Sequence, residues 1–434
     1  MYGLLFGHPK SGDNMTNIRL KSLLMILLMC CAALAGCLDS DDDDDDDDTT
    51  DDTTVTDNGY TYVSDVENHR ALMQDLCDIK DAASSAGGYD FATAKTIYAD
   101  GKNAQKDSGV YRTLGGFASA TGKNHEYDNY YGANGSIGEH IMAAMDGTGD
   151  FENTSNTVRY QGIAKLTVNM GMVGYTIHEL NAAIAKAEAG NWGTDDAQHA
   201  WDEGWAFFHG PTENYGCSPA KVMEKRAADF NTADADGNAA TFLATRTAMN
   251  DGLTALQNEN MQGVVDARDE VLKNLVIVYS QAVLKYTSKM DSNDTAEKYQ
   301  AEGYAFWKAI EAYAGPHMHD GCYNMAVGHK VMMMGEIDAT TCDAFVFTPD
   351  EEGGETGTCT NTVTEAVSPD ATTAEECDGY KSQYYMDNYA ATLMNNVLDL
   401  TDADQLGTSY DVAPWLQPVW DHYGITSSDI GSMS

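Results

Sequence analysis

One short motif occurs twice in this sequence and carries glutamates in equivalent places. Residues 203–208 read E-G-W-A-F-F and residues 302–307 read E-G-Y-A-F-W, and each copy is followed by Gly-Pro, four further residues and Gly-Cys. We interpret so long a spaced pattern as an internal duplication. Glu203 and Glu302 then lie about a pseudo-axis, which is a common way to build a central site.

Histidines accompany the first copy of the motif. His199 precedes Glu203 by four residues, so one helical turn places the two side chains on the same face. A turn near residues 191–192 separates two predicted helices, and the antiparallel hairpin brings His178 and Glu179 level with residues 203–205. Helical bundles hold iron or manganese with carboxylates and imidazoles from paired helices. We therefore predict a metal site formed by His178, Glu179, His199 and Glu203.

The second copy lacks the imidazoles. A turn near residues 292–293 puts Glu302 level with residues 282–283, where Tyr279, Gln281 and Tyr286 are its expected neighbours. If there is one site it is asymmetric, with Glu302 completing it from across the pseudo-axis. The alternative is that both motif glutamates bond buried backbone or tryptophan N–H groups and only lock helices together.

Other polar clusters are weaker candidates. A histidine- and methionine-rich stretch suggests capture of a soft metal such as copper, although methionine runs more often fill a core; it comprises His317, Met318, His319, His329 and residues 332–334. Residues 125–128, H-E-Y-D, offer hard-metal ligands in an expected loop, and Glu139-His140 begins an expected helix.

No catalytic constellation is present. His178-Glu179 resembles the start of H-E-x-x-H, but Ala182 stands where the second histidine is required. No G-x-S-x-G motif and no phosphate-binding glycine loop occurs in the sequence. We therefore expect that this protein is not an enzyme.

The cysteine pattern indicates disulfides in an exported chain. An even set of six cysteines follows Cys37, which is typical of extracytoplasmic proteins: Cys77, Cys217, Cys322, Cys342, Cys359 and Cys377. We expect Cys359–Cys377 as a local loop closure. Cys217 and Cys322 are repeat-equivalent, so each should have an equivalent partner, for which Cys77 and Cys342 are the candidates. Binding of a soft metal by the six thiolates is the alternative, but they include no C-x-x-C pair.

The N-terminus predicts export and anchoring. Basic residues precede the apolar run 23–34, which is too short to span a membrane and reads as a signal-peptide core. It ends in Leu-Ala-Gly-Cys at residues 34–37, which resembles a bacterial lipobox, so residues 1–36 are the expected signal peptide and Cys37 the lipidated residue. The aspartate-rich residues 37–57 are the expected disordered tether. The residue after Cys37 suggests the outer membrane, facing either the periplasm or the cell surface.

The charge excludes one class of partner. The formal net charge is −43, which disfavours nucleic-acid binding. It fits a surface that collects cations and equally a halotolerant soluble surface.

Helix-period apolar residues dominate residues 58–434. The expected helices are 66–83, 92–106, 137–145, 159–189, 195–208, 219–229, 266–289, 295–313, 324–334 and 381–400. Residues 109–138 and 342–378 have no clear periodicity, and no strand alternation stands out. We predict an all-α protein in which two duplicated helical-hairpin units, at about 159–230 and 266–335, fuse into a bundle with a disulfide-stapled loop region.

Several segments together resemble one family. They are the signal sequence, residues 97–103 (I-Y-A-D-G-K-N), 145–151 (M-D-G-T-G-D-F) and 175–180 (Y-T-I-H-E-L), and the repeated E-G-[WY]-A-F. Over roughly residues 60–340 the chain is similar to the Fe-assimilating family, the low-iron- and high-CO2-inducible periplasmic proteins of green algae and their bacterial relatives. The resemblance implies extracytoplasmic iron binding or assimilation and no catalysis. The lipid anchor and acidic tether depart from the algal pattern.

The sequence thus predicts a lipid-anchored iron-binding protein that captures iron and hands it over, with an iron transporter or reductase as partner. A copper-binding periplasmic protein and a helical scaffold or binding lipoprotein are the alternatives.

Overall fold

A computed structural model describes residues 55–434, except 107, 122, 124, 325–329, 336–337, 369–370 and 381–383. The chain divides into two compact units, residues 1–50 with 121–124 and residues 51–120 with 125–434. Nearly all described residues belong to the second unit, and the account below concerns that unit. The predicted signal peptide, Cys37 and most of the predicted tether lie outside the described residues.

The folded unit begins slightly before the predicted boundary. Thr56 and Asp57, which we assigned to the tether, form β1 (Thr56–Asp57), paired with β2 (Tyr60–Thr61). Asp57 is buried because Arg70 donates to its carboxylate, with Arg70 Nε 2.7 Å from Oδ2. Asp57, which we assigned to the acidic tether, therefore belongs to the folded unit, where Arg70 pairs with it.

The helices predicted at residues 66–83 and 137–145 are present, but the region between them differs from the prediction. The N-terminal part contains α2 (Glu67–Ala83), α3 (Phe91–Asp100), α4 (Leu114–Ala118), α5 (Glu126–Tyr131), α6 (Ser136–Asp146) and the short η1 (Gly149–Phe151). α3 ends before the predicted residue 106 because Gly101 adopts a φ of 72°. The region expected to be irregular holds two short helices, which fall below the length at which periodicity is readable.

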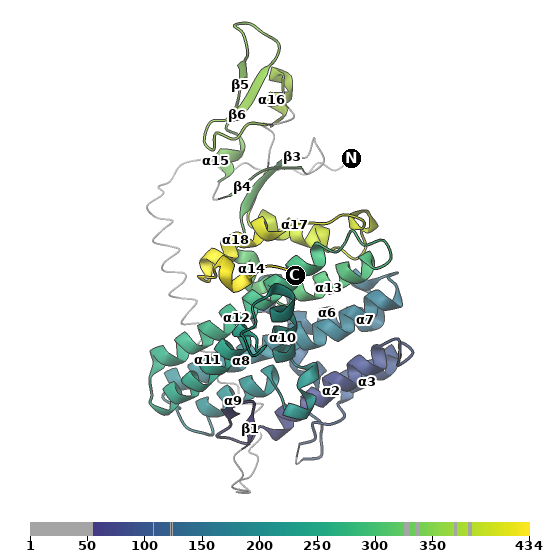
Figure 1. Cartoon of the computed structure of the whole chain (residues 1–434), viewed down its shortest axis with the longest axis vertical. Helices are drawn as coiled ribbons and strands as arrows, with labels where there is room; N and C mark the ends of the chain where they lie inside the picture. Colours follow the sequence, from purple (N-terminus) through teal and green to yellow (C-terminus); the bar gives the residue numbers. More distant parts are fainter. Residues whose placement is uncertain are drawn as a thin grey trace, which may run out of the picture. The chain divides into compact units, whose positions relative to one another are not determined.

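Two helical hairpins carry the two motif copies. α7 (Asn156–Lys165), a π-helical segment (Leu166–Gly171) and α8 (Met172–Glu188) follow without a break and replace the single predicted helix 159–189. α9 (Ala197–Phe208) returns along α8 and bears the first copy, and α12 (Met261–Thr287) and α13 (Ala296–Lys308) form the second hairpin. In Figure 1, α8, α11 (Ala240–Gln257) and α12 lie side by side.

The glycine of each motif copy permits the close approach of a neighbouring segment. A Cβ added at Gly204 would lie 2.8 Å from Leu180 Cδ2, so α9 meets α8 at this level. A Cβ at Gly303 would lie 2.8 Å from Leu398 Cδ2 and 3.5 Å from Tyr286 Cβ. A larger residue at either position would require the facing leucine side chain to move.

The motif aromatics fill the core. Trp205 and Trp307 are fully buried, as is Trp201 one turn before Trp205 on the same helix. Buried aromatic side chains dominate core energetics, since each removes about 150–250 Å² from water. The aromatic part of the repeated motif is therefore structural.

The elements after the two copies differ. The first copy is followed by η3 (Thr212–Cys217) and α10 (Pro219–Phe230), the second by α14 (Glu311–Ala314), η4 (Gly315–His317) and β3 (Asp320–Asn324). The predicted helix 324–334 is wrong, because β3 pairs antiparallel with β4 (Lys330–Gly335) and with β7 (Tyr384–Met386). The helix propensity of the methionines in this stretch is overridden because β4 pairs with β3, the strand that precedes it in the chain.

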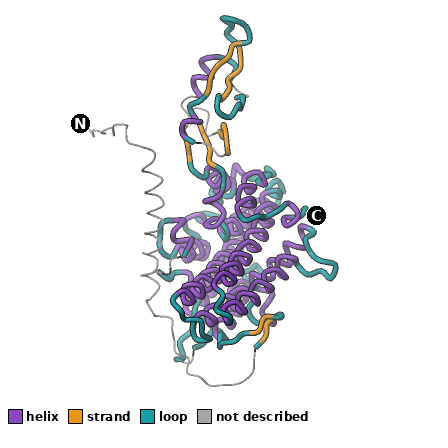
Figure 2. The backbone as a smooth tube through the Cα atoms, turned by 90° about the vertical axis from the view of Figure 1, so that its left-hand side faces the viewer, coloured by secondary structure: helices purple, strands orange, loops and turns teal. Residues whose placement is uncertain are grey.

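The remaining chain mixes short strands and helices, as Figure 2 shows. It comprises α15 (Ala339–Cys342), β5 (Phe345–Pro349), β6 (Gly357–Asn361), α16 (Ala374–Tyr380), α17 (Tyr389–Val397), η6 (Ala403–Gln405), α18 (Ala413–His422) and α19 (Ser427–Ile430). β5 and β6 pair antiparallel. The protein is thus mostly helical, but the prediction that it lacks strands is wrong.

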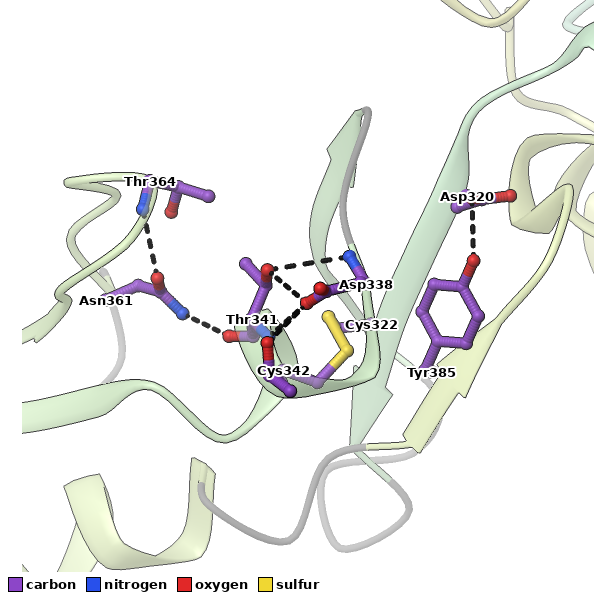
Figure 3. Close-up of a disulfide and its surroundings, with 9 residues drawn as sticks. Asp320, Cys322, Asp338, Thr341, Cys342, Asn361, Thr364 and Tyr385 are labelled. Carbon is purple, nitrogen blue, oxygen red and sulfur yellow. Dashed lines mark hydrogen bonds between the residues drawn. A yellow bond between two sulfur atoms is a disulfide. The ribbon is translucent and has the colours of Figure 1, made fainter. Parts of the chain in front are cut away.

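The described residues form three disulfides: Cys77–Cys217, Cys322–Cys342 and Cys359–Cys377. The predicted pair Cys359–Cys377 is confirmed, and the structure settles which of the candidates Cys77 and Cys342 pairs with which cysteine. Cys77–Cys217 joins α2 to η3, just after the first motif copy. Figure 3 shows Cys322–Cys342 between β3 and α15, near the side chain of Asn361, whose Nδ2 donates to Thr341 O at 2.7 Å. A small hydrophobic cluster that contains Cys322, Cys342, Cys359 and Cys377 is separate from the helical core.

Candidate metal centre

Two imidazoles converge on the carboxylate of the first motif copy. His69 Nε2 lies 2.9 Å from Glu203 Oε1, and His199 Nε2 lies 3.1 Å from the same oxygen. The ring centroids of the two histidines are 6.2 Å apart and their planes differ by 77°. Three groups that commonly bind metals therefore meet at one carboxylate oxygen.

The cluster is mostly buried but reaches solvent on one side. The side chains of His69 and Glu203 are 5% and 15% exposed, and that of His199 is 31% exposed. The ring of Phe207 contacts that of His69 at 5.4 Å, and Phe117 lies behind it at 6.4 Å. His199 thus stands at the entrance of a site whose inner wall is aromatic.

Helix geometry and one buried aspartate position the three residues. His199 and Glu203 lie one turn apart on α9, while His69 comes from the first turn of α2. Asp202 is fully buried, and its Oδ1 accepts from Tyr60 Oη at 2.6 Å. Its Oδ2 accepts from the backbone N–H groups of Val63 and Ser64, both at 2.9 Å. Because this segment leads directly into α2, Asp202 fixes where His69 meets Glu203.

The electrostatics favour an ionised carboxylate. Burial acts to raise the pKa of Glu203, but the charge of His69 and the hydrogen bonds from both imidazoles hold it well below its ordinary value. Burial lowers the pKa of His69 despite the opposing effect of Glu203. For His199, burial is outweighed by the hydrogen bond and charge of Glu203, so its pKa is raised. His199 therefore carries a proton more readily than His69.

The distances from the two imidazole nitrogens to the Glu203 oxygen suit a metal's ligand set, but the orientations of the three side chains do not form a metal site. Bonds of about 2.1 Å at right angles place two ligand atoms about 3 Å apart, close to both distances here. Both imidazoles are, however, aimed at a single oxygen. Within the described ranges, no group of three or more His, Cys, Asp or Glu side chains is arranged to hold a metal ion. A bound ion would have to replace the two contacts to Glu203 Oε1.

One buried atom marks where this cluster is incomplete. His69 Nδ1 is buried and has no hydrogen-bond partner among the described residues. Metal-binding histidines usually donate from their second ring nitrogen to an acceptor that fixes the ring. Packing against Phe207 holds the His69 ring instead.

His178 belongs to a different set of rings. Its ring centroid lies 4.8 Å from that of His125, and its Nε2 lies 4.0 Å from Glu179 Oε1. Tyr175 contacts the His178 ring at 5.7 Å and the Phe207 ring at 5.8 Å, so two aromatic rings connect His178 to the Glu203 cluster. The structure brings His199 to Glu203 as predicted but pairs His178 with His125.

The difference has a simple geometric cause. Gly204 meets the level of Thr176 and Leu180 on α8, so the predicted register of the hairpin is confirmed. A residue two positions along a helix is rotated by about 200°, so His178 points away from the face that Thr176 turns to α9. Register alone does not determine which side chains face one another.

Glu302 of the second copy has cationic neighbours. Lys165 Nζ lies 3.9 Å from Glu302 Oε1. Lys298 occupies the position one turn before Glu302, where the first copy has His199. A cation is disfavoured beside these charges, so we leave Glu302 out of the proposed metal cluster.

The other sequence candidates are dispersed. The His317 ring stacks on that of His422 with centroids 3.5 Å apart. Asp128 accepts from the backbone of Gly135 and Ser136 at the start of α6, which is an ordinary capping role. His140 Nδ1 is bonded to Ser136 O. His329 and the side chains of residues 332–334 lie outside the described part of the chain.

Sequence reasoning missed His69. It lies in a predicted helix remote in sequence from both motif copies, and no spacing rule links it to Glu203. The one available signal is indirect: the suggested pairing of Cys77 with Cys217 places α2 beside the end of the first motif.

A comparison with family models finds a match. The model of the low iron-inducible periplasmic protein family (Fea1) matches residues 47–319, which include both motif copies and His69, His199 and Glu203. The chain therefore belongs to this family. Its members are described as periplasmic and are tied to iron acquisition, and the predicted resemblance is confirmed. No curated protein and no solved structure matches the chain.

The match ends before β3, so the sheet β4-β3-β7 and the segment with the last two disulfides lie beyond it. No helix among the described residues is long and apolar enough to cross a membrane.

Proposed function

We propose that this protein binds iron outside the cytoplasm and assists its acquisition by capture and hand-over, without turnover. One observation carries the proposal: two imidazoles from different helices converge on the ionised Glu203 carboxylate within a family tied to low iron. Two histidines and one carboxylate are the donor set of the facial triad that holds Fe(II), with its other positions open.

The chain's own residues support reversible binding. Glu203 supplies negative charge in a partly buried place, where attraction to a cation is weakly screened. His199 is both the most exposed ligand and the one that holds a proton most readily, so iron enters by displacing that proton. Reprotonation of His199 gives a route for release to a transporter or reductase.

The N-terminal residues complete the proposal. Lipidation at Cys37 and a spacer of aspartates would hold the helical unit close to a membrane, the outer membrane by the residue that follows Cys37. The high negative charge of the whole chain would raise the local concentration of cations near the site.

The test compares Glu203→Gln with Glu302→Gln. Both changes remove one charge at equivalent motif positions, but only Glu203 has imidazole partners. Each protein is purified without chelators, loaded with Fe(II) under anaerobic conditions, and its iron content and affinity are measured. We expect wild type and Glu302→Gln to bind about one iron per chain and Glu203→Gln to lose at least about tenfold in affinity.

Two results would overturn the iron site. If Glu203→Gln keeps full iron affinity and loses only thermal stability, Glu203 merely locks α9 to α2 and the protein is a helical scaffold. If copper is retained in preference to iron and depends on His317, the soft-metal alternative holds.

A further inference from the structure

A second polar cluster, unrelated to the histidines, gathers positive charge. Lys80 on α2, Lys165 at the end of α7, and Lys225 and Arg226 on α10 are near enough to act on one another electrostatically. The chain has 25 Lys and Arg against 68 Asp and Glu, so grouping four cations runs against its overall composition. We call these four residues the cationic cluster.

Arg226 is the buried member of the cationic cluster. It is 5% exposed, and its Nη2 pairs with Asp229 Oδ2 at 2.8 Å. Its Nε and Nη1 are buried and have no hydrogen-bond partner among the described residues. The guanidinium lies over the rings of Tyr286 and Phe306, at 5.4 and 5.7 Å from their centroids. Unsatisfied donors on a buried charged group are costly and uncommon.

Three acidic groups lie near the cationic cluster, and each is either distant from its cations or shared with another: Glu302, Asp229 and Glu224, the last of which pairs with Lys221. Glu302 Oε1 is 3.9 Å from Lys165 Nζ, beyond the range of a direct hydrogen bond. Asp229 is shared, because Lys285 Nζ lies 2.6 Å from its Oδ1. Burial, together with the positive charges of Lys225, Lys80 and Arg226, lowers the pKa of Lys165 to about 8, although Glu302 opposes the shift.

We propose that the cationic cluster binds a small oxyanion with at least two negative charges, of the phosphate or polycarboxylate class. Lys225 is exposed and Lys165 is partly exposed, so both ammonium groups are accessible to a ligand. Arg226 Nε and Nη1 are two further donors that make no hydrogen bond to the described residues. A planar fork of guanidinium donors suits carboxylate and phosphate oxygens.

The site is distinct from the Glu203 cluster and does not rest on the iron proposal. It uses α2, α7 and α10, with Glu302 of the second motif copy at its edge, and includes neither histidine. Lys165, which disfavours a cation beside Glu302, is one of the groups that recruit the anion.

The experiment titrates inorganic phosphate and citrate separately into the metal-free full-length protein by calorimetry. Chloride at matched ionic strength provides the baseline. Variants Lys165→Gln and Lys225→Gln each remove one cluster cation, and Lys95→Gln removes an exposed cation that pairs with Asp146 elsewhere. We expect saturable binding of at least one anion, weakened about five- to tenfold by each cluster variant and unchanged in Lys95→Gln.

The outcomes are separable. Binding of phosphate alone, or of citrate alone, supports the site and identifies the ligand class. Absence of saturable binding of either anion, or equal binding by wild type and both cluster variants, overturns it. Arg226→Lys, which keeps the charge but removes the fork, should weaken binding while the folded state is verified by circular dichroism. Lys225→Gln should give the same result as wild type in the iron measurement, whatever that measurement shows about the iron site.

Discussion

Replacing Gly252 by alanine has two effects on folding stability that oppose each other. It lies inside α11, where alanine is favoured over glycine by up to about 1 kcal/mol of helix propensity. A Cβ at this position would, however, lie 2.0 Å from Trp201 Cζ2 and 2.6 Å from two further ring atoms. Since carbon atoms pack best at about 3.5–4.0 Å, the indole must move by about 1.5 Å.

The indole has little freedom to make that movement. Trp201 is fully buried, and its Nε1 donates to Met249 O at 2.9 Å on the same helix as Gly252. Overpacking costs about 1–3 kcal/mol, and loss of the indole hydrogen bond adds about 1 kcal/mol. After the propensity gain of up to about 1 kcal/mol, we expect Gly252→Ala to lower the free energy of unfolding by about 1–3 kcal/mol.

Urea denaturation followed by tryptophan fluorescence measures the change. Asp251→Ala is the matched control, because it places the same residue at the exposed neighbouring position and should change stability by less than about 0.5 kcal/mol. If Gly252→Ala is as stable as wild type or more stable, the packing of α9 on α11 is looser than described. Because Trp201 precedes Glu203 by two residues on α9, iron affinity should fall in the same variant.

Two further predictions concern the metal cluster. Replacing Cys77 and Cys217 by serine removes a link across a sequence separation of 140, so it should lower the free energy of unfolding by about 4 kcal/mol and weaken iron binding. The Cys359/Cys377 double variant should leave iron binding intact. Equal iron affinity in the two double variants would contradict the role of α2. Iron affinity should rise between about pH 6 and pH 8 because the raised pKa of His199 means that a proton must leave, and this dependence should flatten in His199→Gln. The folding stability of the metal-free protein has the opposite pH dependence. The stabilisation from protonated His199 is fully present below the ordinary histidine pKa of about 6.5, and it is lost as pH rises through the higher pKa of His199 in the folded protein.

Much of the helical framework was predictable because it depends on local periodicity. The predicted helices 195–208 and 219–229 coincide with α9 and α10 to within a few residues. Short spacing predicted the pair Cys359–Cys377, which is confirmed, whereas repeat equivalence named only candidate partners for Cys217 and Cys322. The stretch 324–334 failed because its strand state depends on pairing with β3, and β3 is paired on its other side with β7, which lies far along the chain.

The sequence by itself determined that an acidic, cysteine-paired, mostly helical chain carries a repeated glutamate with a histidine one turn away. These features depend on composition and on spacing within single helices. Only the tertiary structure decided which groups face Glu203 and Glu302: His69 arrives from α2, His178 turns away by helical rotation, and Lys165 lies beside the second glutamate. The physical reason is that a side chain's direction depends on how helices rotate against one another, which packing across the whole core determines.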